Sequence, residues 1–306
     1  MFNSSLLLRW LPVLGWPRLS AGLLRGEVIA GLTVALIVVP QSVAYGALAG
    51  MPVVTGIYAA LLPALVAALF SASPRLAVGP TALSCLLVFA SLSGLAEPGS
   101  GQWVMLAVWL ALLSGAMQIA FGLLRFGWIV QLVSSPVMMG FTQAAGVLII
   151  AGQLPALLGA SGSLFATDAL QWDLRGMAYG LLSLLALVLG RRMRPSFPTV
   201  LLCISVAGAF SWQTGFGTTG GQVIGTLPSG LPGLQMPGWI GWRTLGDLLL
   251  PALIIALVSF LETASSAKVD NQAKGQFWNE NQDLLAQGLA KLAAAASGAF
   301  PTSSSF

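Results

Sequence analysis

The chain has 306 residues, of which 57% are hydrophobic and only 7% are charged, and its formal net charge is +4. A soluble domain carries about 25% charged residues, so this composition excludes a soluble monomer and predicts an integral membrane protein in contact with the lipid bilayer. The sequence contains no histidine, which removes most Ser-His and Cys-His nucleophiles and most zinc sites, so we expect neither an enzyme nor a metal centre.

Residues 1–26 precede the first long apolar segment. Arginines and prolines interrupt them, so they lack the continuous apolar core of a cleaved signal peptide. Arg9, Arg18 and Arg25 lie among apolar residues, which indicates a cytoplasmic amphipathic segment at the membrane face.

Nine apolar segments follow, judged against the roughly 20 residues that cross a bilayer core as a helix. They predict an all-α integral membrane fold. The third segment is short and follows Pro80, and a tenth would begin near Thr302. The longer connections at 152–174 and 214–244 are more polar, and the second is expected to be irregular because it is rich in Gly, Pro and Thr. The segments lie near 27–47, 52–70, 81–95, 103–124, 128–151, 175–190, 197–213, 245–267 and 284–298.

The basic residues predict the orientation of these segments. With a cytoplasmic N-terminus, most of them fall in loops on the inside, and only Arg175 and Arg243 fall outside. We therefore expect a multi-pass protein of the cell (inner) membrane with its N-terminus in the cytoplasm. The basic residues are spread over several loops rather than clustered, so no nucleic-acid partner is expected. The inside set is Arg9, Arg18, Arg25, Arg75, Arg125, Arg191, Arg192, Arg194, Lys268 and Lys274.

Two pairs of segments indicate an internal repeat. Residues 26–39, GEVIAGLTVALIVV, and 246–259, GDLLLPALIIALVS, each open with glycine and an acid before an apolar run. The dipeptide Pro-Thr occurs at 80–81 and again at 301–302, so the members of both pairs are separated by nearly the same length of chain. Segments 8 and 10 would then repeat segments 1 and 3. Because seven segments is an odd number, the second copy would be inverted in the membrane, as in many secondary transporters.

The stretch AVGPTALS at 77–84 is a candidate anion site. Proline is favoured in the first turn of a helix, and Gly79 lets the chain bend into that turn. If the helix begins inside the membrane, its first amides and its dipole favour an anion, and Thr81 could add a hydroxyl donor. FPTSSSF at 300–306 would supply a second helix start that faces the first. A capping turn at the bilayer surface remains the alternative.

Glu262 is the most informative single residue. It lies about 22 Å beyond Asp247 along a helix, which places it inside the membrane. An intramembrane carboxyl group is costly and is a functional candidate by default, since it could bind and release a proton. Ser266 lies one turn further on the same face. A buried structural acid paired with Lys or Arg is the alternative.

Gln41 corresponds to Glu262 when the spacing between the two Pro-Thr dipeptides is applied to it. Tyr45 lies one turn beyond Gln41 and shares its face. Both side chains could border a substrate, or they could instead hydrogen bond and pack between helices. Lys291, in the ninth segment, has an open role and could extend its ammonium group to the membrane interface.

These residues resemble a known family. Residues 26–87, from GEVIAGLTVALIVVPQSVAYGALAG to AVGPTALSCLL, are similar to the opening of SulP-type anion permeases. Residues 262–306 resemble the eighth to tenth segments of that family, with an acid, an Asn-Gln pair and a Pro-Thr-Ser-rich stretch. This is the sulfate permease family, which also includes bicarbonate and dicarboxylate carriers.

The resemblance implies a fold of fourteen segments in two inverted repeats of seven, as in uracil-permease-like transporters. Here it implies that 27–124 are core-domain segments 1–4 and 125–213 are gate-domain segments 5–7. Residues 214–244 would be an extracellular loop, and 245–306 would hold core-domain segments 8–9 and the start of 10. Members are usually homodimers linked to a cytoplasmic STAS domain, and their core slides against the gate as an elevator.

The resemblance also implies roles for single residues. The substrate would lie between the starts of segments 3 and 10, beside segments 1 and 8. Glu262, with Ser266 one turn away, would hold the coupling ion, which is H+ or Na+, and no other cofactor is expected. The substrate-binding residues so assigned are Gln41, Tyr45, Thr81, Ala82, Ser304 and Ser305.

The chain departs from the family pattern at Phe306, where it stops before the Ser-Arg that normally follows. Segments 11–14 and the STAS domain are then missing, so we expect either a fragment or a truncated gene product. For the parent protein we expect proton-coupled uptake of a small anion, with sulfate as the leading substrate and bicarbonate or a dicarboxylate as alternatives. Sodium-coupled bicarbonate uptake and a non-transporting anion sensor or motor are the rival hypotheses.

Overall fold

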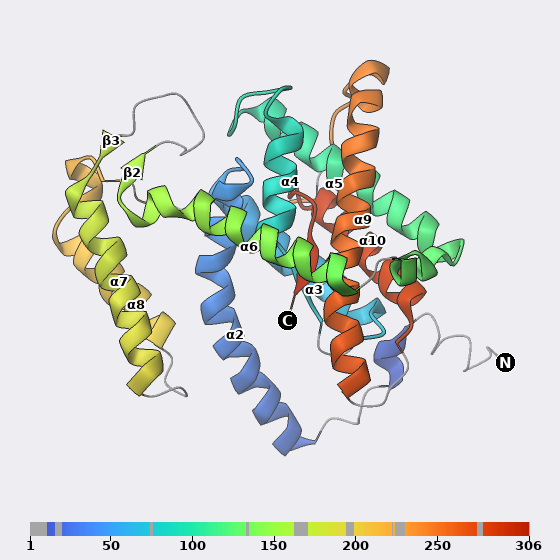
Figure 1. The fold of residues 1–306 in the computed structure, drawn as a ribbon, viewed down its shortest axis with the longest axis horizontal. Coiled ribbons are helices and arrows are strands. Elements are labelled where there is room, and N and C mark those ends of the chain that lie inside the picture. Colours follow the sequence, from blue (N-terminus) through green and yellow to red (C-terminus); the bar gives the residue numbers. More distant parts are fainter. Residues whose placement is uncertain are drawn as a thin grey trace. The chain divides into compact units, whose positions relative to one another are not determined.

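The computed structural model is built almost entirely from helices (Figure 1). It describes residues 11–15, 20–73, 76–132, 135–161, 171–193, 199–221, 223, 230–234, 236–273 and 278–305. The elements are η1 (Pro12–Gly15), α2 (Ala21–Leu48), α3 (Val53–Phe70), β1 (Ala77–Gly79), α4 (Ala82–Leu92), α5 (Gly101–Leu123), η2 (Phe126–Leu132), α6 (Ser135–Leu157), β2 (Ala160–Ser161), β3 (Gln171–Trp172), α7 (Leu174–Met193), α8 (Thr199–Gln213), η3 (Phe216–Thr219), α9 (Trp242–Ala273), α10 (Glu280–Ala296) and β4 (Ser303–Ser305).

The predicted apolar segments are all helices in the part of the chain that the structure describes, from α2 to α10. Within that part, five helical stretches are long and apolar enough to cross a membrane. This confirms the all-α membrane fold. The five stretches are Ala21–Leu48, Val53–Phe70, Gly101–Leu123, Leu174–Met193 and Trp242–Ala267.

Helix α2 begins earlier than the sequence predicts, at Ala21 rather than near residue 27. The reason is a cap: the hydroxyl oxygen of Ser20 accepts a hydrogen bond from the amide of Leu23 at 3.2 Å. The end of the predicted amphipathic segment is therefore part of α2. Residues 1–10 and 16–19 of that segment lie outside the described residues.

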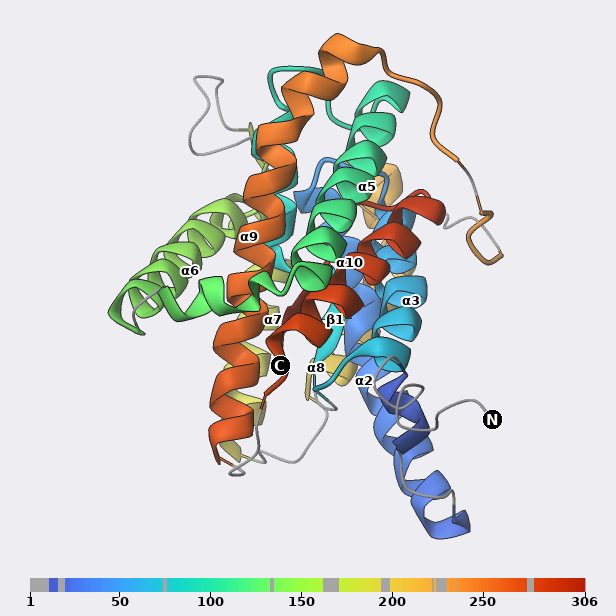
Figure 2. The same ribbon diagram turned by 90° about the vertical axis from the view of Figure 1, so that its right-hand side faces the viewer.

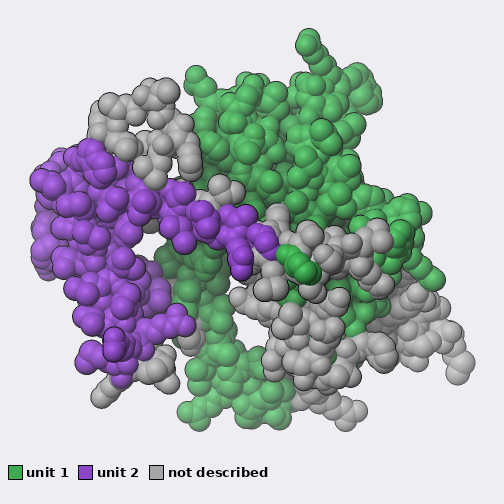
Figure 3. All heavy atoms as spheres, in the orientation of Figure 1, with its two compact units in different colours: residues 1–138, 228–306 green, residues 139–227 purple. Residues whose placement is uncertain are grey.

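The chain forms two compact units, coloured separately in Figure 3. Unit 1 comprises residues 1–138 and 228–306, and unit 2 comprises residues 139–227. In unit 2, α7 packs against α8, and β2 pairs with β3 in antiparallel fashion. A cavity of about 620 Å³ lies between α7 and α8, and none of the predicted site residues lines it. The division into core and gate segments stays a prediction.

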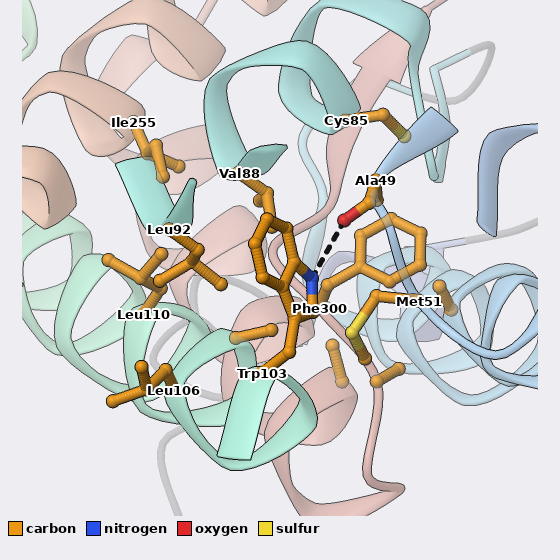
Figure 4. Packing of buried hydrophobic residues seen from close by; sticks show 14 of the residues in the cluster. Ala49, Met51, Cys85, Val88, Leu92, Trp103, Leu106, Leu110, Ile255 and Phe300 are labelled. Carbon is orange, nitrogen blue, oxygen red and sulfur yellow. Dashed lines mark hydrogen bonds between the residues drawn. The ribbon is translucent and has the colours of Figure 1, made fainter. Parts of the chain in front are cut away.

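The apolar core of unit 1 surrounds the indole ring of Trp103, which has no exposed surface (Figure 4). Its Nε1 donates a hydrogen bond to the carbonyl oxygen of Ala49 at 3.0 Å, so the buried polar atom is satisfied. The ring packs against the turn between α2 and α3. Gly50 in that turn has φ +68, and a Cβ there would lie 2.8 Å from the Trp103 ring, so only glycine fits.

Helix α10 runs between α5, α3 and α9 (Figure 2). It approaches α5 closely because glycines face each other at the crossing. A Cβ added at Gly288 would lie 2.7 Å from the carbonyl oxygen of Gly115. Small residues of this kind let two helix backbones come together. The close crossing brings polar side chains of α5 and α10 within reach of each other.

Strands β1 and β4 pair in antiparallel fashion, which the sequence does not predict. Gly79 lies opposite Ser303, and Ala77 lies opposite Ser305. The expected helix start near Thr302 is corrected by this pairing: Ser303–Ser305 is extended, since it forms a strand with β1. Two stretches that are far apart in the sequence are thus joined side by side.

Candidate functional site

Helix α4 begins immediately after β1 and Pro80. Thr81 is its N-cap, and its hydroxyl oxygen accepts a hydrogen bond from the amide of Ser84 at 3.3 Å. In return, the amide of Thr81 donates to the hydroxyl oxygen of Ser84 at 3.2 Å, which completes a capping box. No carbonyl of the helix can reach the amides of Ala82 and Leu83. These two amides are therefore the donors that this helix start could offer to an anion.

Glu262 of α9 lies directly against this helix start. Thr81 Oγ1 donates a hydrogen bond to Glu262 Oε2 at 3.1 Å, and Ser303 Oγ donates to the same oxygen at 2.6 Å. The two donors come from the beginning of α4 and from β4, so the β1–β4 pairing holds both in place. Both donors are neutral, and the carboxyl group forms no ion pair among the described residues.

Gln41 and Tyr45 line a separate cavity of about 340 Å³ between α2, α3 and β1. The volume lies at the lower end of the range for small-ligand sites, which is about 300–1,000 Å³. Gln41 Nε2 donates a hydrogen bond to Tyr45 Oη at 2.9 Å, as their spacing of one helical turn allows. Pro80 forms part of the wall, and none of the described lining residues carries a formal charge.

The structure therefore divides the first four of the predicted substrate residues into two groups. Gln41 and Tyr45 belong to the cavity, which also reaches Gly79 and Pro80. Thr81 and Ala82 are buried at the start of α4, and Thr81 contacts Glu262. The β1–α4 connection joins the two groups.

The remaining predicted residues lie around Glu262 in different ways. Ser304 is fully buried, and its hydroxyl contacts Thr263 and Gln287 rather than Glu262. Ser305 is in β4, but its side chain lies outside the described part of the structure. Ser266 is half-buried, and within the described residues its hydroxyl does not join the contacts of Glu262.

Ser303 is not among the predicted site residues, although it makes the shorter hydrogen bond to Glu262. A signal existed, because the spacing that relates Gln41 to Glu262 also relates Ala82 to Ser303. The hydroxyl of Thr302, next to Ser303, is a second group of the site that the sequence analysis does not identify. Thr302 is 1% exposed, and its hydroxyl has no hydrogen-bond partner among the described residues. It is a further donor that a ligand could use.

A buried polar network continues from this point into the centre of unit 1. Gln118 Nε2 of α5 donates hydrogen bonds to Ser259 Oγ at 2.9 Å and to Gln287 Oε1 at 3.2 Å. Gln287 Nε2 in turn donates to Ser304 Oγ at 2.9 Å and contacts Thr263 Oγ1. The network links α5, α9, α10 and β4, and sequence reasoning missed its amides because their partners lie on other helices.

Lys291 of α10 belongs to this network. Its side chain has no exposed surface, which excludes the proposed extension to the membrane interface. Lys291 Nζ donates hydrogen bonds to Gln118 Oε1 and to Ser259 Oγ, both at 2.7 Å. An ionisable residue of each sign therefore belongs to this region: Lys291 is buried within the network, and Glu262 is half-buried at its edge.

Comparison with known proteins adds to this geometry. Residues 24–306 match the sulfate permease family. A probable sulfate transporter of Mycobacterium tuberculosis (strain CDC 1551 / Oshkosh) is 31% identical over 293 residues, which cover 92% of this chain and 52% of that protein. The chain thus spans about half the length of the curated relatives it matches.

Solved structures share the fold. The overall structure of SLC26A9 matches with a TM-score of 0.85 and 21% identity, covering 99% of this chain and 52% of that one. The transmembrane domain of a cyanobacterium bicarbonate transporter, BicA, matches with a TM-score of 0.75 and 23% identity, covering 94% and 76%. These likenesses show the fold, and the family match confirms the resemblance seen in the sequence: the chain belongs to the sulfate permease family.

Proposed function

We propose that this protein is a secondary active transporter of a small anion, with sulfate as the leading substrate and bicarbonate or a dicarboxylate as alternatives. Membership of the sulfate permease family supports the proposal, as does the similarity to the mycobacterial protein, a probable sulfate transporter. An enzymatic role has no support in the family or in the residues of the site.

The observation that carries the proposal is the start of α4 beside the uncharged cavity. The amides of Ala82 and Leu83, which no helix carbonyl reaches, lie at the positive end of a helix dipole. Such a position favours an anion without a formal positive charge. In the proposed site the anion meets these amides, with Gln41 and Tyr45 on the cavity side and the serines of β4 on the other.

Glu262 is the proposed site of the coupling ion. Its carboxyl group receives hydrogen bonds from two neutral hydroxyls beside the proposed anion seat. A proton bound there would remove the negative charge next to the anion, so uptake of the two would be linked. Sodium coupling, with bicarbonate as the anion, is the alternative, because carboxylate and hydroxyl oxygens also suit a hard cation.

The chain is part of a multi-pass membrane protein, and its family and apolar helices support that statement. We further propose a location in the cell membrane with a cytoplasmic N-terminus, since the basic residues favour that orientation. In this proposal the protein is a homodimer and moves its core as an elevator, as the family resemblance implies.

The test is uptake of radiolabelled sulfate by liposomes that contain the full-length protein. We expect accumulation above the level of empty liposomes, with competition by unlabelled sulfate stronger than by bicarbonate or a dicarboxylate. A different order of competition would replace sulfate by the better competitor. Binding of sulfate without flux would favour the sensor or motor hypothesis, and neither binding nor flux of any of the three anions would overturn the proposal.

A further inference from the structure

Lys291 is a buried cation without an adjacent carboxylate in the described part of the structure. Its ammonium group has no exposed surface, and its hydrogen-bond acceptors, Gln118 Oε1 and Ser259 Oγ, are both neutral. Among the described residues no carboxylate oxygen lies within ion-pair distance of it. Burial of an unpaired charge is costly, so a negative charge nearby would stabilise the ammonium form of Lys291.

Among the described residues, the charged groups around α10 leave one candidate for that compensation. Helices α3 and α5 and the short helix η2, which pack against α10, contain no charged residue. On α10 itself, Glu280 and Asp283 lie in the first turn, and even Asp283 is about 12 Å along the axis from Lys291. The carboxylate of Asp283 is also satisfied by four other donors.

Helix α9 supplies the remaining charges. Arg243 and Asp247 lie near its beginning, several helical turns before Ser259, and the side chains of Lys268 and Asp270 lie outside the described part. Glu262 is about one turn beyond Ser259, whose hydroxyl binds Lys291. It is therefore the described carboxyl group that lies nearest the network around the ammonium group.

Ser259 connects the two charges. Its hydroxyl accepts the hydrogen bond from Lys291 Nζ, while its carbonyl oxygen accepts one from Ser303 Oγ at 3.4 Å. Ser303 Oγ also donates to Glu262 Oε2 at 2.6 Å. Ammonium and carboxyl groups are thus separated by two buried serines, while Glu262 itself is half-buried. Attraction between a buried charge and a half-buried charge is screened less than attraction between two exposed charges.

We propose that Lys291 is a built-in countercharge for Glu262, so that the coupling site needs no sodium ion. The proposal rests on the proposed role of Glu262 and favours proton over sodium coupling. Lys291 touches no substrate in this arrangement, and acts as a positioning residue that keeps the carboxylate form of Glu262 compensated when no proton is bound.

The first test compares Lys291→Met with Lys291→Arg in liposomes that contain the full-length protein. Radiolabelled sulfate uptake is measured at one pH in sodium and in choline. Wild type should take up sulfate at the same rate in sodium as in choline, and so should Lys291→Arg. In choline, the uptake rate of Lys291→Met should be lower than that of wild type by about tenfold or more, as expected when one partner of a buried charge pair is removed. In sodium, much of the lost uptake should return. An equal loss in both salts, or no loss, would overturn the proposal.

The second test is a double-mutant cycle on thermal stability of the detergent-solubilised full-length protein. Glu262→Gln and Lys291→Met each leave one charge uncompensated, so the double variant should be more stable than the sum of the single effects predicts. Ser114→Ala, which removes a buried hydroxyl of α5 bonded to the carbonyl oxygen of Leu110, is the control and should combine additively with Glu262→Gln. Additive effects for the charged pair, or failure of both Lys291→Met and the double variant to fold, would contradict the proposal.

The two proposals can fail separately. A wild-type protein that neither binds nor carries the tested anions removes the proposed function, whereas the stability cycle still measures the charge pairing. A wild-type protein that carries sulfate, combined with an additive cycle, removes only the role of Lys291.

Discussion

Asp283 shows at the level of single residues how this protein buries a negative charge. The residue is 1% exposed at the start of α10. Its Oδ1 accepts hydrogen bonds from Ser71 Oγ and from the amide of Ala72, both at 2.8 Å. Its Oδ2 accepts from Ser73 Oγ and from Trp278 Nε1, both at 2.6 Å. Four donors on one carboxylate tie the α3–β1 connection to α10, and so help to place β1.

Replacement of Asp283 by Asn should therefore destabilise the protein. The NH2 group of Asn would face the donors that now bind the carboxylate. At least one buried hydrogen bond to a charged group is then lost, at a cost of about 1.5–3 kcal/mol. Thermal unfolding of the detergent-solubilised protein measures the effect. The exposed Asp247 is the matched control, and Asp247→Asn should change stability by less than about 0.5 kcal/mol. Equal stability of both variants would contradict this account of Asp283.

A substitution at Gln41 tests whether the anion binds on the cavity side of the proposed site. Its amide group borders the cavity and bonds to Tyr45 Oη. Gln41→Leu removes one hydrogen-bonding group, so the KM for sulfate should rise about tenfold, the equivalent of one lost hydrogen bond. Uptake kinetics measure the change, with the exposed Gln102→Leu as control. An unchanged KM in Gln41→Leu would place the anion elsewhere.

At the level of elements, the crossing of α5 and α10 positions the buried network. Gly288 has no room for a side chain, since a Cβ would lie 2.6 Å from Ile119 Cγ1 and 2.7 Å from the carbonyl oxygen of Gly115. A wider crossing would draw Lys291 away from Gln118. The hydrogen bond of 2.7 Å between these two residues therefore depends on glycine at the contact.

Gly288→Ala should for this reason cost about 1–3 kcal/mol through overpacking, although alanine is the better helix former. Gly246→Ala in α9 is the control, because nothing lies within 4 Å of the added Cβ. The control should be neutral or stabilise the helix by up to about 1 kcal/mol. Thermal unfolding measures both, and a Gly288→Ala variant as stable as its control would show that the helices are not in close contact there.

The helices can be predicted from the sequence because each is a local property of a long apolar run. The start of α4 at Pro80 and Thr81 is also readable, since proline and a capping residue are local signals. The pairing of β1 with β4 is not. Both strands have three residues, too few for a periodic pattern, and β4 contains none of the β-branched or aromatic residues that are enriched in strands. The pairing results from tertiary structure.

At the level of the whole molecule, the candidate site is only partly readable from the sequence. Glu262 is recognisable because a carboxyl group in an apolar run is rare, and the repeated Pro-Thr dipeptide indicates that Pro80 and Pro301 lie in related segments. The partners of Lys291 lie on α5 and α9, and no spacing along the chain reveals such contacts. The roles of these residues in transport stay predictions.

In the proposed mechanism, Glu262 beside the start of α4 links anion uptake to a proton. The most direct measurement is the initial rate of sulfate uptake by liposomes carrying the full-length wild type or Glu262→Gln, with and without an inward proton gradient. We predict that the gradient accelerates the wild type several-fold and leaves the rate of Glu262→Gln unchanged. A Glu262→Gln variant that responds to the gradient as the wild type does would contradict the claim.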